Sequence, residues 1–183
     1  LDDGAGILFV SDENISGLAR GHWEQGFYTN CRAVLEAVSG CCAGHDLTLM
    51  FSTREPKSWL RSLHAHLTRA IGLRATLETF SRLEAFRTID WEGFISSATN
   101  GLDVTIVQTS LEATKDLRLG PLSDLLVPFV DEKTLAAWRP VAASHKSLPP
   151  KVVEFAQSRI VRNLPGGLRW FVIRQFNSLY KLF

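Results

Sequence analysis

The sequence has few cysteines, and their placement excludes two classes of protein. Its three cysteines, Cys31, Cys41 and Cys42, are odd in number, two of them are adjacent, and none has the spacing of a metal site. They therefore indicate neither a disulfide framework nor a zinc site. We expect a reducing compartment, with a cytoplasmic location as the default.

Long apolar runs are also missing. No stretch of about 18 apolar residues occurs, so we expect no transmembrane segment. A basic segment followed by an apolar core, which marks a secretory signal peptide, is absent as well. The first residue is Leu1 and not methionine, from which we expect that an N-terminal portion precedes it.

Neither sign of charge dominates. The chain has 20 basic and 19 acidic residues and a formal net charge of +1, which favours neither a nucleic acid nor a membrane as partner. The phosphate motif G-x-x-x-x-G-K-[ST] is absent, which argues against a P-loop kinase. What remains is the composition of a globular protein, 45% apolar and 21% charged. Its 183 residues favour one domain spanning residues 1–183.

The most informative stretch is Leu47–Leu63, which reads LTLMFSTREPKSWLRSL. Its apolar beginning, Leu47–Phe51, predicts a buried strand. Pro56 suits the first residue of a helix, where a missing N–H costs nothing, and apolar residues then recur at helical spacing to about Ile71. Arg54 is thus predicted at the carboxyl end of a strand, where open α/β sheets bind ligands and where a guanidinium suits a phosphate.

A serine on the predicted helix completes a familiar pattern. Arg54, Pro56 and then Ser62, eight residues after the arginine, resemble the 3′-phosphate motif of the PAPS-dependent sulfotransferases. The resemblance implies that Arg54 and Ser62 bind the 3′-phosphate of the nucleotide donor PAPS, 3′-phosphoadenosine 5′-phosphosulfate. The alternative is a strand-end arginine that pairs with an acid, together with an ordinary serine on a helix surface.

Two further apolar runs, Ile7–Val10 and Val104–Val107, predict strands. We expect both to be parallel neighbours of Leu47–Phe51, since helical segments separate the three. The predicted fold is therefore α/β, with a small parallel sheet flanked by helices and a helical C-terminal half.

Helical spacing predicts several helices, with Asp90 and Asp131 as two of the N-caps. The predicted segments are Cys31–Ser39, Pro56–Ile71, Ala75–Phe86, Trp91–Ala98, Pro121–Val130, Glu132–Trp138, Pro149–Leu164 and Leu168–Phe183. Pro165-Gly166-Gly167 predicts a loop or hinge before the last helix. That helix interleaves aromatic and basic residues, and we expect it to dock on the core, with a place on a membrane surface as the alternative.

The resemblance to sulfotransferases extends in order and pattern from about Ile7 to Leu164. Val104–Leu111 resembles the family's late strand, although Ser110 replaces the acid that usually precedes the leucine. Ser144–Ile160 resembles the entry to a late helix. The family's loop for the 5′-phosphosulfate, rich in Gly, Ser and Thr, has no counterpart here. Since that loop precedes the strand matched by Ile7–Val10, we expect it in the portion before Leu1.

The polar loop after Ile7–Val10 supplies the candidate catalytic base. The resemblance implies a base in this loop, and we assign Glu13, with Asp12 as the close rival and His22 as the second choice. The alternative is that the two acids cap a helix beginning near Asn14 or face water.

Together these residues favour an enzyme over a binding domain without deciding between them. The resemblance implies a P-loop sulfotransferase-like fold that transfers a sulfuryl group from PAPS to a hydroxyl or amine of a carbohydrate or small molecule, without a metal. The alternative is a non-catalytic domain of the same fold that binds a nucleotide or a protein partner.

Overall fold

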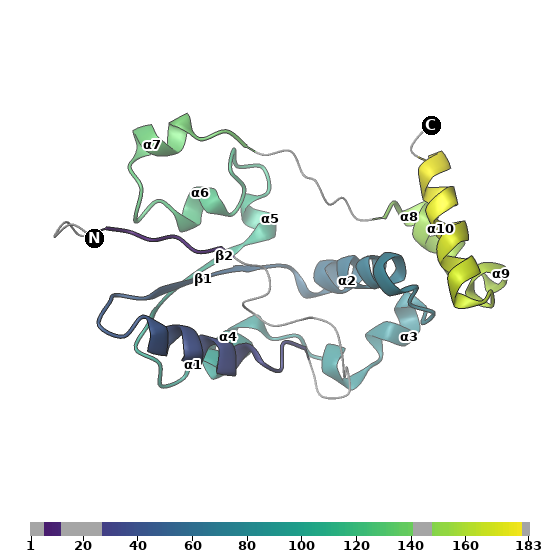
Figure 1. Cartoon of the computed structure of the whole chain (residues 1–183), viewed down its shortest axis with the longest axis horizontal. Helices are drawn as coiled ribbons and strands as arrows, with labels where there is room; N and C mark the ends of the chain where they lie inside the picture. The colour runs from purple at the N-terminus through teal and green to yellow at the C-terminus, as the bar shows by residue number, and fades with distance from the viewer. Residues whose placement is uncertain (1–5, 12–26, 141–147, 181–183) are drawn as a thin grey trace. The chain divides into compact units, whose positions relative to one another are not determined.

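The computed structural model describes residues 6–11, 27–140 and 148–180, and the chain divides into two compact units (Figure 1). The sheet unit comprises Leu1–Glu55 and Ile89–Val141, and the helical unit comprises Pro56–Thr88 and Ala142–Phe183. The single domain expected over residues 1–183 depends on how the units associate, and it stays a prediction.

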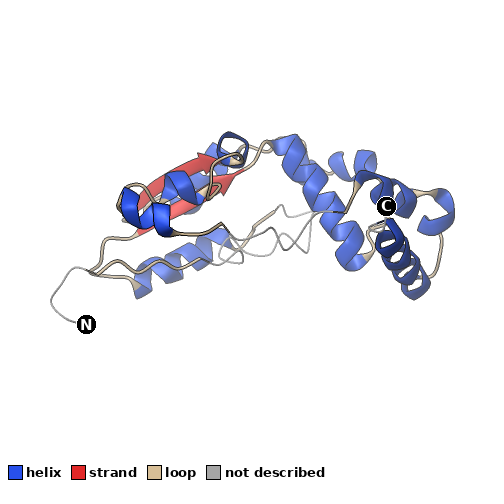
Figure 2. Ribbon diagram, turned by 90° about the horizontal axis from the view of Figure 1, so that it is seen from above, coloured by secondary structure: helices blue, strands red, loops and turns tan. Residues whose placement is uncertain are grey.

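The sheet unit is built on a pair of parallel strands, β1 (Thr48–Thr53) and β2 (Thr105–Ser110) (Figure 2). Their register runs from Thr48 opposite Thr105 to Thr53 opposite Ser110. Two of the predicted strands are thereby confirmed as parallel neighbours. Each strand extends beyond its apolar run, because the polar residues that follow still pair through their backbones.

Helices flank both sides of this strand pair (Figure 1). On one side α1 (Cys31–Cys41) packs against α4 (Trp91–Thr99), and on the other lie α6 (Leu122–Leu125) and α7 (Glu132–Ala137). The buried cluster beneath the strands joins both α1 and α4 to β1: Cys31, Leu35, Leu49 and Ala98. The fold is therefore mixed α/β, with a small parallel sheet flanked by helices.

The strand predicted at Ile7–Val10 is wrong. The part of this region that the structure describes, residues 6–11, is irregular, and the described sheet has two strands. Leu8 is 87% exposed and Val10 71%, although Phe9 makes an edge contact with Phe129 at 6.0 Å between ring centroids. An apolar run favours burial, but a strand also needs a neighbour to pair with, and sequence period alone does not supply one.

The helical unit consists of helices from both of its two chain segments. Its elements are α2 (Pro56–Ile71), α3 (Leu77–Ser81), the 3₁₀ helix η2 (Glu84–Phe86), α8 (Pro150–Gln157), α9 (Arg159–Arg162) and α10 (Gly166–Tyr180). One buried cluster joins α8, α9 and α10: Leu148, Val152, Ala156, Val161 and Ile173. Beside it the rings of Phe155 and Phe176 stack with centroids 4.0 Å apart.

A buried arginine connects several helices of this unit. The guanidinium of Arg169, only 1% exposed, donates to the carbonyl oxygens of Gly72, Leu73 (2.9 Å) and Ala156 (3.1 Å). Gly72 and Leu73 directly follow α2, and Ala156 lies in the last turn of α8, where carbonyl oxygens lack intrahelical partners. Arg169 therefore satisfies two helix ends at once and ties α10 to both.

Several predicted helices are confirmed with small changes at their ends. These are Cys31–Ser39, Pro56–Ile71, Trp91–Ala98, Glu132–Trp138 and Leu168–Phe183, the last over its described residues. Both predicted N-caps are present, since Asp90 accepts from the backbone N–H of Gly93 at 3.0 Å and Asp131 accepts from that of Thr134 at 2.9 Å.

Four other boundaries are wrong. Ala75–Phe86 is split into α3 and η2, and only Leu122–Leu125 of Pro121–Val130 is α-helical. Pro149–Leu164 breaks at Ser158, whose backbone is extended and whose hydroxyl accepts from the N–H of Val161 to begin α9. The loop predicted at Pro165–Gly167 is short, because α10 already begins at Gly166. A proline just before a helix start is as compatible with an N-terminus as with a hinge.

Candidate functional site

The candidate site lies at the carboxyl ends of β1 and β2. Because the strands are parallel and Thr53 pairs with Ser110, the residues that follow each strand leave the sheet at the same edge. Arg54 and Glu55 follow β1, and Leu111 and Glu112 follow β2 as the first residues of α5 (Leu111–Thr114). This edge therefore brings together a cation and a carboxylate that are 58 positions apart in the sequence.

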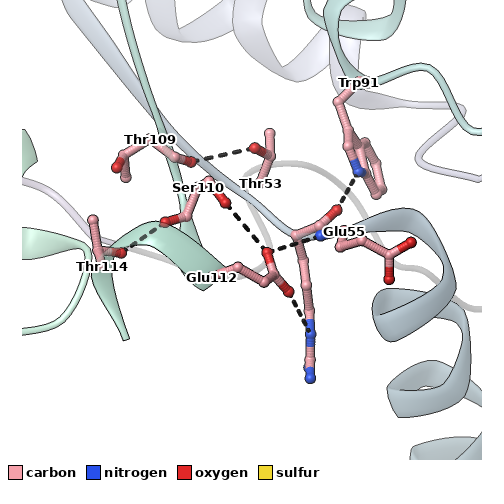
Figure 3. Close-up of polar contacts among 8 residues, drawn as sticks. Thr53, Glu55, Trp91, Thr109, Ser110, Glu112 and Thr114 are labelled. Atoms are coloured by element: carbon pink, nitrogen blue, oxygen red, sulfur yellow. Dashed lines mark hydrogen bonds and ion pairs between the residues drawn. The ribbon is translucent and has the colours of Figure 1, made fainter. Parts of the chain in front are cut away.

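Glu112 is the residue on which the contacts at this edge converge (Figure 3). Its Oε1 lies 3.6 Å from the Nε of Arg54, an ion pair whose side chains are 39% and 35% exposed. Its Oε2 accepts from the backbone N–H of Glu55 at 2.9 Å and from the hydroxyl of Ser110 at 3.3 Å. One carboxylate thus connects the residues that follow both strands.

These contacts stabilise the ionised form of Glu112. The hydrogen bond from the backbone N–H of Glu55 is the main reason that the pKa of Glu112 is lowered from its ordinary value. Partial burial opposes this effect, while its own backbone N–H, the Ser110 hydroxyl and the positive charge of Arg54 add to it. Glu112 is therefore a charged acceptor at this edge and is poorly suited to donate a proton.

Hydroxyl groups and an indole fix the backbone around this pair (Figure 3). Thr53 donates to the carbonyl oxygen of Thr109 at 3.2 Å, and Thr114 donates to that of Ser110 at 2.8 Å. The indole N–H of Trp91, at the start of α4, donates to the carbonyl oxygen of Arg54 at 2.6 Å. Arg54 is consequently held through its backbone as well as through its ion pair.

No protein-family model, curated protein or solved structure matches this chain. The partly exposed guanidinium of Arg54, next to the carboxylate of Glu112, suits the binding of an oxyanion that can compete for the arginine.

Of the predicted site residues, the structure describes Arg54 and Ser62. Arg54 lies at the carboxyl end of a parallel strand, as predicted. Ser62 is half-buried on α2 and belongs to the helical unit, whereas Arg54 belongs to the sheet unit. Glu13, its rival Asp12 and the second choice His22 lie outside the described residues.

Sequence reasoning missed Glu112. The resemblance draws attention to the position before Leu111, where Ser110 stands in place of the usual acid. The acid is present on the other side of Leu111, two residues after Ser110. An acid in the first helical turn after a predicted parallel strand was the available signal, because it must leave the sheet at the same edge as Arg54.

Two further findings concern metal binding and membrane-spanning helices. Within residues 6–11, 27–140 and 148–180, no three His, Cys, Asp or Glu side chains come together in a way that could hold a metal ion. None of the helices in these ranges is long and apolar enough to cross a membrane.

Proposed function

We propose that this chain is a sulfotransferase-like protein that binds PAPS at the carboxyl edge of its parallel strands. The observation that carries the proposal is the position of Arg54, directly after β1 and held there by Glu112 and Trp91. Ligands of open α/β proteins bind at this edge, and arginine is well suited to phosphate. The role of Ser62 in holding the same 3′-phosphate is supported by the sequence motif alone.

A phosphate has to compete with Glu112 for Arg54. The existing ion pair is long, at 3.6 Å, and more than a third of each side chain is exposed. Such pairs contribute roughly 0–1 kcal/mol, whereas a charge-assisted hydrogen bond to a phosphate contributes about 1.5–3 kcal/mol. Binding of a dianionic phosphate is therefore compatible with this ion pair, with Glu112 keeping its bond to the backbone N–H of Glu55.

The proposed reaction moves one sulfuryl group. The oxygen of an acceptor hydroxyl, or the nitrogen of an amine, forms a bond to the sulfur of PAPS. The bond from that sulfur to the bridging oxygen of the 5′-phosphate breaks, and adenosine 3′,5′-bisphosphate leaves with the electron pair. Glu13 takes the proton of the acceptor. Arg54 and Ser62 hold the far, 3′ end of the donor and so contribute position more than stabilisation of the leaving group.

The first prediction concerns the nucleotide. Titration calorimetry with adenosine 3′,5′-bisphosphate should show binding, and AMP, which lacks the 3′-phosphate, should bind more weakly. Arg54→Ala should weaken binding of the bisphosphate by roughly 2–3 kcal/mol and Ser62→Ala by about 1 kcal/mol, because a phosphate oxygen loses its donor. Equal binding of the two nucleotides by the unaltered chain would contradict the proposal.

Two control variants separate recognition from other effects. Arg61→Ala removes an exposed positive charge next to Ser62 and should leave binding nearly unchanged. Glu112→Gln removes the competing carboxylate and should not weaken binding. If Arg54→Ala and Arg61→Ala reduced binding equally, the interaction would be a general effect of charge.

The second candidate is a non-catalytic domain that binds a nucleotide or a protein partner. The ion pair with Glu112 favours it, because it gives Arg54 a structural reason to be at this edge. Glu13→Gln distinguishes the two candidates. With the predicted loop for the 5′-phosphosulfate present, an enzyme should transfer labelled sulfate from PAPS to a panel of acceptors, and Glu13→Gln should keep nucleotide binding and lose that transfer. A binding domain should show no transfer even with that loop present.

A further inference from the structure

The two compact units carry opposite charges. The helical unit contains thirteen lysines and arginines but only three acidic residues, Glu78, Glu84 and Glu154, which gives a formal charge of +10. The sheet unit contains seven basic and sixteen acidic residues, a formal charge of −9. The net charge of +1 is therefore the difference between two large and separate charges.

Positive charge in the helical unit is least compensated around α9 and α10. Two of the three acids are paired elsewhere, Glu78 with Arg82 on α3 and Glu84 with Arg87 at η2. The sequence from Arg159 to Tyr180 contains no acidic residue but carries four arginines, of which Arg169 is buried. A further arginine reaches this segment, since the guanidinium of Arg74 donates to the carbonyl oxygen of Leu164 at 3.1 Å.

The pKa of the buried Arg169 is also affected by the neighbouring positive charges. Its pKa is lowered from the ordinary value, mainly by burial, and the positive charges of Arg74 and Arg162 lower it further. Arginines from α2's end, α9 and α10 are thus close enough to affect one another.

Large apolar side chains are exposed on the same two helices. Ile160 on α9 is 79% exposed, and Leu168 and Phe171, one turn apart on α10, are 50% and 53% exposed. The opposite face of α10 is covered, with Arg169 and Ile173 buried. Trp170 is 45% exposed and lies beneath the guanidinium of Arg174, 5.1 Å from its ring centroid.

We propose that α9 and the part of α10 up to Arg174 form a docking surface for an anionic lipid bilayer. Ile160, Leu168 and Phe171 enter the boundary between headgroups and acyl chains, and Arg159, Arg162 and Arg174 bind the acidic headgroups. Basic residues beside exposed aliphatic and aromatic residues are the composition of helices that lie in a membrane interface. The two helices that carry these side chains pack against each other (Figure 1).

The apolar residues favour lipid over nucleic acid. A nucleic acid would be attracted by the same arginines and could stack on Trp170 and Phe171. Exposed aliphatic side chains such as Ile160 and Leu168 gain little from a phosphate backbone. In a bilayer interface they are removed from water, which is favourable in proportion to the apolar area covered.

The test is vesicle binding by the full chain. Vesicles of phosphatidylcholine with about 30% phosphatidylserine should sediment the protein and shift its tryptophan fluorescence to shorter wavelength. Pure phosphatidylcholine should bind it far less, and raising the salt from roughly 0.1 to 0.5 M should release it, because screening weakens contacts between exposed charges.

Matched variants locate the surface. Arg159→Gln combined with Arg174→Gln should weaken binding roughly tenfold to thirtyfold, since each basic residue near an anionic bilayer contributes about fivefold. Lys133→Gln combined with Arg139→Gln removes two exposed charges from the sheet unit and should change binding less than about twofold. Leu168→Gln combined with Phe171→Gln should weaken binding and abolish the fluorescence shift. Circular dichroism should be unchanged in all three, because every altered side chain is exposed.

Three results would overturn the proposal. One is binding of a single-stranded oligonucleotide, with the same sensitivity to Arg159 and Arg174, by a chain that leaves anionic vesicles unbound. Another is vesicle binding that the Leu168 and Phe171 variants leave unchanged, which would indicate a general polyanion surface. The third is self-association in sedimentation experiments that those variants abolish while the unaltered chain ignores vesicles.

Discussion

Glu112 gives the strand ends their polar organisation. It accepts hydrogen bonds from residues after β1 and at the end of β2, and it pairs with Arg54. A carboxylate in this position stabilises the edge only while it is ionised. Its contribution to folding therefore depends on pH.

The sign of that dependence follows from the direction of the pKa shift. Because the pKa of Glu112 is lower in the folded chain, its contribution is complete above the ordinary glutamate pKa of about 4.5 and is lost as the pH falls through the lower folded value. Glu112→Gln should therefore be less stable than the unaltered chain at pH 7, and the gap should narrow below about pH 4.5. Urea unfolding of both proteins at pH 7, 5 and 3.5 measures this difference in unfolding free energy.

A glutamate in a different setting provides the control. Glu36→Gln removes an exposed helical ion pair with Arg32 and should cost only about 0.3–0.5 kcal/mol at pH 7. A stability gap for Glu112→Gln that stayed constant from pH 7 to 3.5 would show that the carboxylate is not held in its ionised form.

Of the ion pair at the strand ends, one partner could be predicted from the sequence and the other could not. Arg54 could be placed at a strand end because a polar tetrapeptide lies between an apolar run and a proline. Its partner could not, because Glu112 lies 58 residues away and only the register of β1 with β2 brings it near. Glu13 is a different case, since its part of the chain lies outside the described residues.

At the level of elements, the end of α2 shows how the helical unit is joined. Gly72 follows α2 with a φ of +64°, a conformation that favours glycine, and its carbonyl oxygen accepts from Arg169. A Cβ at Gly72 would lie 3.0 Å from Nη1 of Arg169. The tight turn and the buried arginine therefore depend on each other.

Substitution of two glycines separates these two effects. Gly101 also has a positive φ, +76°, but a Cβ there would meet no atom within 4 Å. Gly101→Ala should cost about 1 kcal/mol of unfolding free energy, from backbone conformation alone. Gly72→Ala should cost more, about 2–4 kcal/mol, because it also disturbs a buried guanidinium that satisfies two helix ends. Denaturant unfolding of both variants tests this, and equal losses would mean that Arg169 adapts freely.

Element boundaries could be predicted where side chains mark them, as at Asp90, Asp131 and Pro56. The predictions were wrong at boundaries that are set by backbone conformation and that no capping side chain marks. Ser158 is extended and divides a segment whose apolar spacing is continuous, and Gly166 begins a helix although glycine is a poor helix former. Packing of Ile173 and burial of Arg169 give α10 a stability that helix propensity does not supply.

For the molecule as a whole, the sequence predicted balanced charge and the structure separates it. The sum of +1 is correct, but it cannot show which residues share a compact unit. The sequence between Pro56 and Thr88 and that after Ala142 fold together, and both are basic. Their common excess became visible only from this grouping.

The separation of charge has a consequence for purification. The sequence gives an isoelectric point near 8.0, where a protein with evenly mixed charge should bind to no ion-exchange resin. This chain should bind at that pH to both a cation exchanger, through its helical unit, and an anion exchanger, through its sheet unit. Salt should elute it from each. Passage through both columns at low salt would mean that the two charges neutralise each other within the folded chain.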